Sequence, residues 1–122
     1  PGTGAIPPVQ RLIADGVEVF CGSDNIRDAW SPYGDGDMLR RAGIVGYRAG
    51  LVTDAALRLA FDLVTAAPAR VIGRPAAKLS EGAPADIVLV AAEGVPEAVA
   101  TAPPRALVVK AGRIIARQGV LA

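Results

Sequence analysis

Residues 17–25 read VEVFCGSDN, a run of β-branched, aromatic and apolar residues that stops at a Gly-Ser-Asp-Asn cluster. Such a run favours a strand, and the polar cluster after it favours a turn. We therefore predict a buried strand over residues 17–21 that leads into a loop. Asp24 then stands at the carboxyl end of the strand, where parallel α/β sheets and barrels present their functional groups.

Helical signals lie on both sides of this strand. A proline at Pro8 and a glycine at Gly16 suit the start and the end of a short helix. After the strand, residues 26–36 show no periodicity and predict an irregular loop. Asp37 can then cap a helix that runs to Arg48.

The clearest helical pattern runs from about Thr53 to Ala66, because its apolar residues recur at i, i+3, i+4 and i+7 behind a threonine N-cap. Its apolar stripe is wide, so we expect it to pack against more than one neighbour. Pro68 starts a further single turn over residues 69–72, which Gly73 closes.

The carboxyl-terminal part of the sequence changes to strand patterns. Residues 74–85 are rich in Pro, Ala, Gly and Ser and predict an extended crossing. The apolar run Ile87–Val90 is typical of a strand buried on both faces, and residues 107–116 predict a hairpin with a two-residue turn. Between them, residues 94–104 predict a loop or one weak helical turn.

Composition excludes several classes of function. The 122 residues include 13 Lys and Arg against 12 Asp and Glu, so the chain offers no basic face for nucleic acid. The longest apolar run is far shorter than the ~20 residues that a membrane span requires, so we expect no membrane partner. One cysteine rules out an internal disulfide framework and favours the cytoplasm. The chain has no histidine, so alone it holds neither a Ser-His-Asp triad nor a histidine-ligated metal.

Four polar or aromatic residues near the predicted turn are candidates for chemistry. The Asp24 carboxylate can ligate a metal ion or take a proton from water, although a turn or cap role is the simpler alternative. Asn25 and Asp28 can orient a substrate, or they are merely solvated. Trp30 can form an aromatic wall for a planar ligand or plug its own core.

Several segments together resemble the metal-dependent amidohydrolase superfamily, in its C-terminal third. They are residues 11–24, 65–73, 81–90 and 109–116. The stretch GSDNIRDAWSPYGDGDM, residues 22–38, is most similar to bacterial cytosine deaminases and related aminohydrolases.

This resemblance implies an α/β fold, the C-terminal portion of a (β/α)8 barrel with strands of a small β-sandwich. Residues 1–73 are then expected to supply the last barrel strand and the C-terminal helices. Residues 74–122 are expected to form the β-sandwich segment with its hairpin. The opening residues Pro1 to Gly4 carry no initiator Met, so we expect a piece of a longer protein.

The resemblance also implies residue roles. Asp24 matches the family's catalytic Asp, which ligates one divalent metal ion, iron or zinc, and helps to transfer the proton of the attacking water. Trp30 matches a tryptophan near the substrate pocket. Asn25 stands where cytosine deaminases carry a second acidic residue, a departure that argues against cytosine itself as the substrate. The family's histidine ligands and its acid/base Glu would lie upstream, so we expect the isolated chain to be inactive and free of metal.

We therefore expect the C-terminal part of a hydrolase that cleaves C–N bonds of cyclic amides, amidines or aminated heterocycles. Its expected partners are a small-molecule substrate and either the missing N-terminal part of the same protein or other copies of this chain. Without barrel neighbours, the strand over residues 17–21 should pair with another chain or expose its edges. The alternative is a non-catalytic small α/β domain that binds a protein partner.

Overall fold

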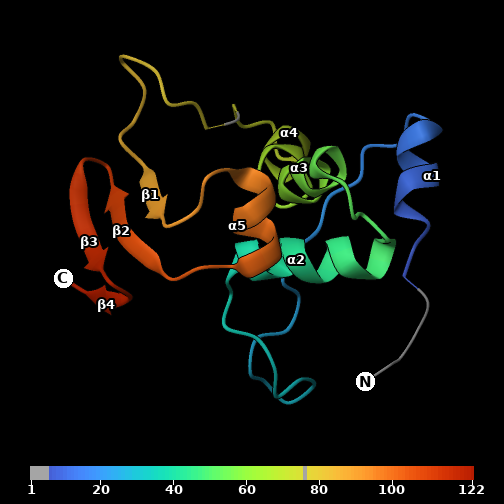
Figure 1. Ribbon diagram of the computed structural model, residues 1–122, viewed down its shortest axis with the longest axis horizontal. Coiled ribbons are helices and arrows are strands. Elements are labelled where there is room, and N and C mark those ends of the chain that lie inside the picture. Colours follow the sequence, from blue (N-terminus) through green and yellow to red (C-terminus); the bar gives the residue numbers. More distant parts are fainter. Residues whose placement is uncertain (1–5, 76) are drawn as a thin grey trace.

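A computed structural model describes residues 6–75 and 77–122, so the opening segment Pro1 to Gly4 lies outside the described residues. Five helices and four strands lie within the described part (Figure 1). In chain order they are α1 (Val9–Ala14), α2 (Met38–Ala49), α3 (Asp54–Asp62), α4 (Ala66–Val71), β1 (Ile87–Val90), α5 (Val95–Thr101), β2 (Arg105–Lys110), β3 (Arg113–Arg117) and β4 (Val120–Leu121).

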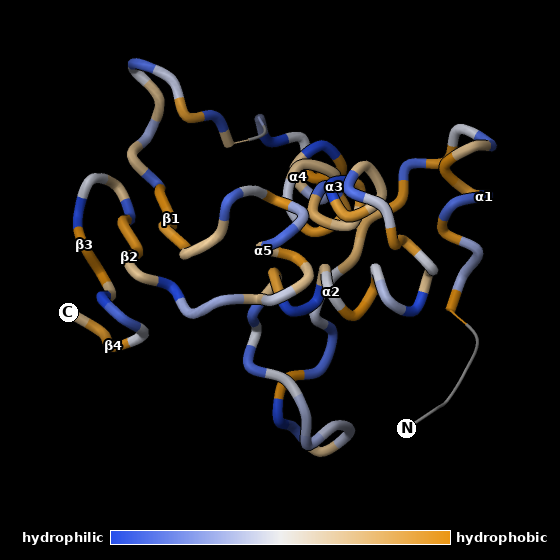
Figure 2. The backbone as a smooth tube through the Cα atoms, viewed as in Figure 1, coloured by the Kyte–Doolittle hydropathy of each residue, from blue (hydrophilic) through white to orange (hydrophobic). Residues whose placement is uncertain are grey.

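The helices α2, α3 and α5 pack together around the main hydrophobic cluster, and the sheet lies at one end of the molecule (Figure 1). The buried members of the cluster are Ala42, Leu51, Ala60, Val64 and Val99. Apolar segments of the three helices meet there, whereas the loop below α2 is mostly polar (Figure 2). Among the described helices, none has the length and apolar character needed to cross a bilayer.

The helix predicted after Asp37 is confirmed, and its two ends show why. The Asp37 carboxylate accepts hydrogen bonds from the backbone N–H groups of Leu39 (2.9 Å) and Arg40 (3.2 Å), which supplies the N-cap. At the other end, Gly50 adopts a left-handed φ of 69° and closes the helix. The short helix predicted before Gly16 is confirmed as α1.

The single helix predicted over residues 53–66 is confirmed up to Asp62 and is wrong only in its last turn. Thr53 caps α3 as expected, through a 3.2 Å bond from the Ala56 N–H. The helix then ends at Asp62, and α4 begins already at Ala66. The Thr65 hydroxyl donates to the Phe61 carbonyl (2.7 Å), and this side-chain bond competes with continued α-helical pairing.

The strand predicted over residues 17–21 does not form in the described structure. The backbone of this segment is held at its two ends, where the Val17 N–H donates to the Leu12 carbonyl (2.9 Å) and the Cys21 N–H donates to the Leu63 carbonyl (2.8 Å). A strand requires a neighbouring strand for its hydrogen bonds, and the described chain supplies none here. The predicted burial is wrong as well, because Val17 and Phe20 are about half exposed.

The four strands form one antiparallel sheet in the order β1-β2-β3-β4. The predicted hairpin is confirmed, with Ala111 and Gly112 both at positive φ (48° and 76°), as a tight two-residue turn requires. The prediction that Ile87–Val90 is buried on both faces is wrong. This strand, β1, lies at the edge of the sheet, and its residues Val88 and Leu89 are about half exposed.

The sequence predicted a loop or one weak helical turn over residues 94–104, and this prediction is wrong because helix α5 forms there. Val99, which is 1% exposed, inserts among α2 and α3, and this burial stabilises two turns of helix. The approach is close, since a Cβ at Gly43 of α2 would lie 2.9 Å from the Val99 carbonyl oxygen. Helix α5 thus packs on α2 and α3 although it comes from the carboxyl-terminal part of the sequence.

Candidate active site

Asp24 lies where the extended segment 17–23 turns into the loop over residues 24–36. Its φ is 53°, a left-handed conformation that aspartate tolerates better than most residues with a Cβ. The side chain is exposed, and within residues 6–75 and 77–122 its carboxylate forms no hydrogen bond or ion pair. A free carboxylate is therefore presented at the entrance to the loop.

Asp28 organises the loop from inside. Its Oδ2 accepts a 2.5 Å hydrogen bond from the Asn25 amide, and its Oδ1 accepts from the backbone N–H groups of Trp30 (2.9 Å) and Ser31 (3.0 Å). The Asn25 bond is the largest of the effects that hold the pKa of Asp28 below its usual value. Asn25 is thus oriented by Asp28, one residue from Asp24.

Trp30 and Tyr33 expose their aromatic rings on this loop. Their exposed fractions are 82% and 75%. The possibility that Trp30 plugs its own core is therefore wrong for the described chain. The ring is available for contact with a ligand or with another part of a larger protein.

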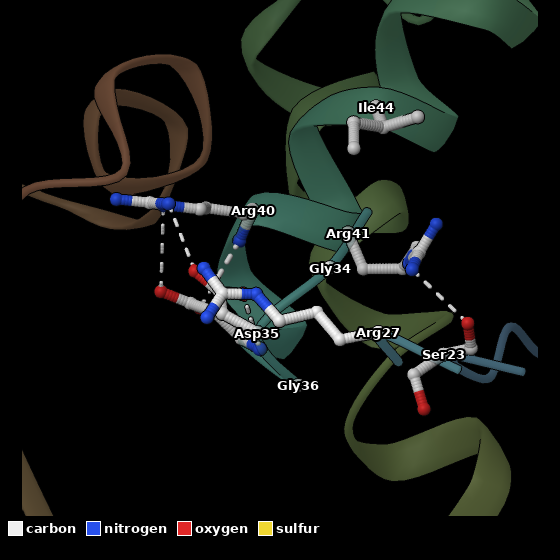
Figure 3. Close-up of a pocket in the computed structure, with 9 residues that line it drawn as sticks. Ser23, Arg27, Gly34, Asp35, Gly36, Arg40, Arg41 and Ile44 are labelled. Atoms are coloured by element: carbon white, nitrogen blue, oxygen red, sulfur yellow. Dashed lines mark hydrogen bonds and ion pairs between the residues drawn. The ribbon is translucent and has the colours of Figure 1, made fainter. Parts of the chain in front are cut away.

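A hollow of about 260 Å³ lies between the loop and the first turns of α2 (Figure 3). Its lining residues are Ser23, Arg27, Gly34, Asp35, Gly36, Asp37, Arg40, Arg41 and Ile44. Asp24 is outside this set, although its neighbour Ser23 belongs to it. The predicted site residues thus lie beside the hollow, and charged residues from α2 line it.

Ion pairs and hydrogen bonds join the loop to α2 and to the sheet. Arg40 Nη1 donates to Asp35 Oδ2 at 2.8 Å, and Arg105 of β2 pairs with Asp37. Asp35 Oδ1 also accepts a 2.9 Å hydrogen bond from the Asp37 backbone N–H. This bond is the largest of the effects that lower the pKa of Asp35. Arg41 Nη2 donates to the Ser23 carbonyl at 3.0 Å, as Figure 3 shows.

Sequence reasoning missed these arginines. The adjacent pair Arg40 and Arg41 directly after a capping aspartate was an available signal, since residues in a first helical turn lie next to the loop that precedes it. Arg105 gave no such signal, because it lies 68 positions from Asp37.

The residues described here fit part of a metal site. Asp24 offers an unengaged carboxylate, a suitable ligand for iron or zinc. Within the described residues, however, no group of three or more His, Cys, Asp or Glu side chains gathers around a common point. Asp24 can thus supply one ligand, and further ligands must come from elsewhere.

Comparison with known proteins identifies the family. Residues 1–116 match the sequence model described as the amidohydrolase family. The chain belongs to the amidohydrolase family. The resemblance inferred from sequence is confirmed, and a family of hydrolases gives no support to the alternative of a non-catalytic interaction domain.

Two curated amidohydrolase relatives have described activities. The N-isopropylammelide isopropyl amidohydrolase of Pseudomonas sp. (strain ADP) is 36% identical over 115 residues, which is 93% of this chain and 28% of that protein. The pterin deaminase of Rhizobium rhizogenes (strain K84 / ATCC BAA-868) is 34% identical over 113 residues, 89% of this chain and 25% of that protein.

Solved structures of the family extend this likeness. N-isopropylammelide isopropylaminohydrolase from Burkholderia multivorans ATCC 17616 matches with a TM-score of 0.91 and 44% identity, over 100% of this chain and 31% of that chain. The 5-methylcytosine deaminase from Klebsiella pneumoniae, liganded with phosphonocytosine, matches with a TM-score of 0.80 and 28% identity, over 96% and 29%. The amidohydrolase chain described here spans less than a third of each of these four relatives.

Proposed function

We propose that this chain is the C-terminal part of a metal-dependent amidohydrolase that removes an exocyclic amine from a nitrogen heterocycle. The observation that carries this proposal is the match over 100% of the chain, at 44% identity and a TM-score of 0.91, to an N-isopropylammelide isopropylaminohydrolase. The match covers the whole chain, so it extends over the loop that bears Asp24, Asn25 and Trp30.

Asp24 is the metal ligand and proton carrier in this proposal. A divalent ion, iron or zinc, would lower the pKa of the attacking water when it is bound. The Asp24 carboxylate takes a proton from the attacking water and passes it to the departing nitrogen. The water oxygen forms the new bond to the ring carbon, the exocyclic C–N bond breaks, and the amine leaves with the proton.

Asn25 and Trp30 are proposed to contact the substrate. Asn25 can donate to or accept from a ring nitrogen or oxo group, and Asp28 holds its amide in one orientation. The exposed indole of Trp30 suits a flat heterocycle. A neutral Asn25 favours rings that require no second carboxylate from the protein.

The substrate class follows from what the relatives' named compounds have in common. N-isopropylammelide, pterin and 5-methylcytosine are nitrogen heterocycles that carry an amino or alkylamino group on a ring carbon. We propose that the substrate is a compound of this class. An alkylamino-substituted ring is favoured, because the identity to the N-isopropylammelide isopropylaminohydrolase is 44%. The product amine is then an alkylamine or ammonia.

The remaining structural expectations stay part of the proposal. Residues 1–73 would complete a (β/α)8 barrel, with residues 17–21 pairing as its last strand, and residues 74–122 would contribute to a β-sandwich. The partner that supplies the missing strands and metal ligands is the N-terminal part of the same protein or, failing that, other copies of this chain. The proposed location is the cytoplasm.

The direct test uses the full-length protein that contains this chain, loaded with iron or zinc and assayed for metal content. N-isopropylammelide, pterin, 5-methylcytosine and cytosine serve as substrates, with amine release followed by mass spectrometry. We expect turnover of at least one aminated ring by the full-length protein and none by the 122 residues alone. Absence of amine release from every ring, with metal bound, would overturn the proposed reaction.

A further inference from the structure

Two arginines in the first turn of α2 hold the two ends of the loop that carries Asp24. Arg41 Nη2 donates to the Ser23 carbonyl at 3.0 Å, where the loop begins. Arg40 Nη1 donates to Asp35 Oδ2 at 2.8 Å, where it ends. The next residue in α2, Ala42, is fully buried, so both contacts tie the loop to the hydrophobic core.

The Ser23 carbonyl has a direct geometric relation to Asp24. It belongs to the peptide plane that precedes Asp24, and the angle φ of Asp24 relates this plane to the Asp24 Cβ. At a φ of 53° Asp24 occupies a region that residues with a Cβ rarely adopt and that persists only where surrounding contacts hold it. A restraint on the Ser23 carbonyl is therefore a restraint on the direction of the Asp24 carboxylate.

We propose that Arg41 is the positioning residue for Asp24 and acts through the Ser23 carbonyl. This rests on the proposed role of Asp24 as a metal ligand. Within the described residues Arg41 has no carboxylate partner, so no ion pair accounts for its placement. Its guanidinium instead caps one backbone oxygen next to the site.

The returning part of the loop meets the same guanidinium. Gly34, with a φ of 100°, lies beside it: a Cβ there would be in ordinary van der Waals contact, 3.5 Å from the Asn25 carbonyl oxygen and 3.9 Å from Arg41 Nη2. Arg41 thus lies against both sides of the loop. Loss of its guanidinium removes the hydrogen bond that orients Ser23 and opens space beside Gly34.

The test compares three variants of the full-length, metal-loaded protein: Arg41→Gln, Arg41→Lys and Arg58→Gln. Arg58 is an exposed arginine on α3, away from the loop, and controls for loss of a surface charge. Hydrogen exchange is measured on peptides that cover residues 22–34, together with metal content, kcat, KM and melting temperature. The Lys variant keeps the charge and one donor, so it should recover part of any loss.

In Arg41→Gln we expect exchange in the loop to accelerate by about tenfold, as for one lost charge-assisted hydrogen bond. Metal content should fall, and kcat should fall by about a hundredfold, since small displacements of a catalytic group cost this much. KM and melting temperature should stay near those of Arg58→Gln.

Unchanged loop exchange in Arg41→Gln would overturn the proposal. Faster exchange with kcat and metal content equal to those of Arg58→Gln would also overturn it, because the contact would then serve the loop without directing Asp24. If the unmodified protein released no amine from any ring, the proposed function would fail, and the exchange data would still decide whether Arg41 holds the loop.

Discussion

Asp24 combines a rarely adopted backbone conformation with a carboxylate that has no partner in the described chain. A surface carboxylate in a turn usually bonds nearby backbone N–H groups, as Asp28, Asp35 and Asp37 do here. Asp24 alone among these four neighbours leaves its oxygens unused within the described residues. This difference separates a candidate ligand from residues that organise the loop.

Asp24→Asn in the full-length protein is expected to lower kcat by about 10²–10⁴-fold, because the amide cannot carry a proton. Metal content should fall as well, since a neutral amide oxygen is a weaker ligand for iron or zinc than a carboxylate. The measurements are amine release and metal analysis of the purified variant. Turnover at the unmodified rate with a full complement of metal would remove Asp24 from both roles.

The loop should open in acid. The pKa of Asp28 lies below its ordinary value of about 3.9, chiefly because of the Asn25 hydrogen bond, so the ionised form stabilises the folded loop. This stabilisation is complete above the unfolded pKa and is lost as the pH falls through the lower folded value, below about pH 4.

Trp30 reports this opening, because it is the one tryptophan of the chain and its backbone N–H donates to Asp28. Fluorescence of the 122-residue chain should change as the pH is lowered through this range. In Asp28→Asn, whose amide does not titrate, the same change should be absent. An identical acid transition in both proteins would show that Asp28 does not control the loop.

At the scale of single elements, the turn between β2 and β3 places an alanine where its backbone is least suited. Both central residues, Ala111 and Gly112, have positive φ, and only glycine adopts this without a steric penalty. A Cβ at Gly112 would meet nothing within 4 Å. Any effect of Gly112→Ala therefore reports backbone conformation and not a clash.

We expect Gly112→Ala to lower the free energy of unfolding by about 1–2 kcal/mol, the cost of a left-handed conformation for a residue with a Cβ. Ala111→Asn should instead raise it by about 0.5 kcal/mol, because asparagine tolerates this conformation and favours such turns. Urea unfolding of the chain measures both. Equal stabilities of the two variants would contradict a turn with two left-handed residues.

At the scale of the whole molecule, α5 joins the carboxyl-terminal part of the chain to the helices before it. Gly43→Ala tests this contact, since the added Cβ would lie 2.9 Å from the Val99 carbonyl, and backbone must move to relieve it. Alanine improves helix propensity by about 1 kcal/mol, yet overpacking costs about 1–3 kcal/mol. We expect a net loss in the free energy of unfolding.

Gly46→Ala on the same helix is the matched control. Its Cβ would lie 3.4 Å from the Ala60 Cβ, near ordinary contact, so the gain in propensity should offset most of the crowding. Thermal unfolding of the two variants should place Gly43→Ala clearly below Gly46→Ala. The reverse order would mean that α5 does not pack against α2 as described.

Local chemistry made several features predictable from sequence. Asp37 and Thr53 cap helices because their side chains reach N–H groups two or three residues away, and the hairpin at residues 111–112 follows from its two-residue turn. The family was predictable too, because motifs such as residues 22–38 are continuous in sequence. For the same reason Asp24, Asn25 and Trp30 could be singled out as candidates without a structure.

Features that depend on distant parts of the chain were not predictable. Residues 17–21 have the composition of a strand but lack a pairing neighbour in the described chain, and α5 forms because Val99 is buried between α2 and α3. The contact of Arg41 with Ser23 spans 18 positions, and that of Arg105 with Asp37 spans 68. The sequence by itself therefore determined the caps, the turn, the family and the candidate residues, since these depend on neighbours in the chain. Only the tertiary structure decided which strands pair, which helix is buried and what holds the loop, because packing and hydrogen bonding join residues that sequence separation keeps apart.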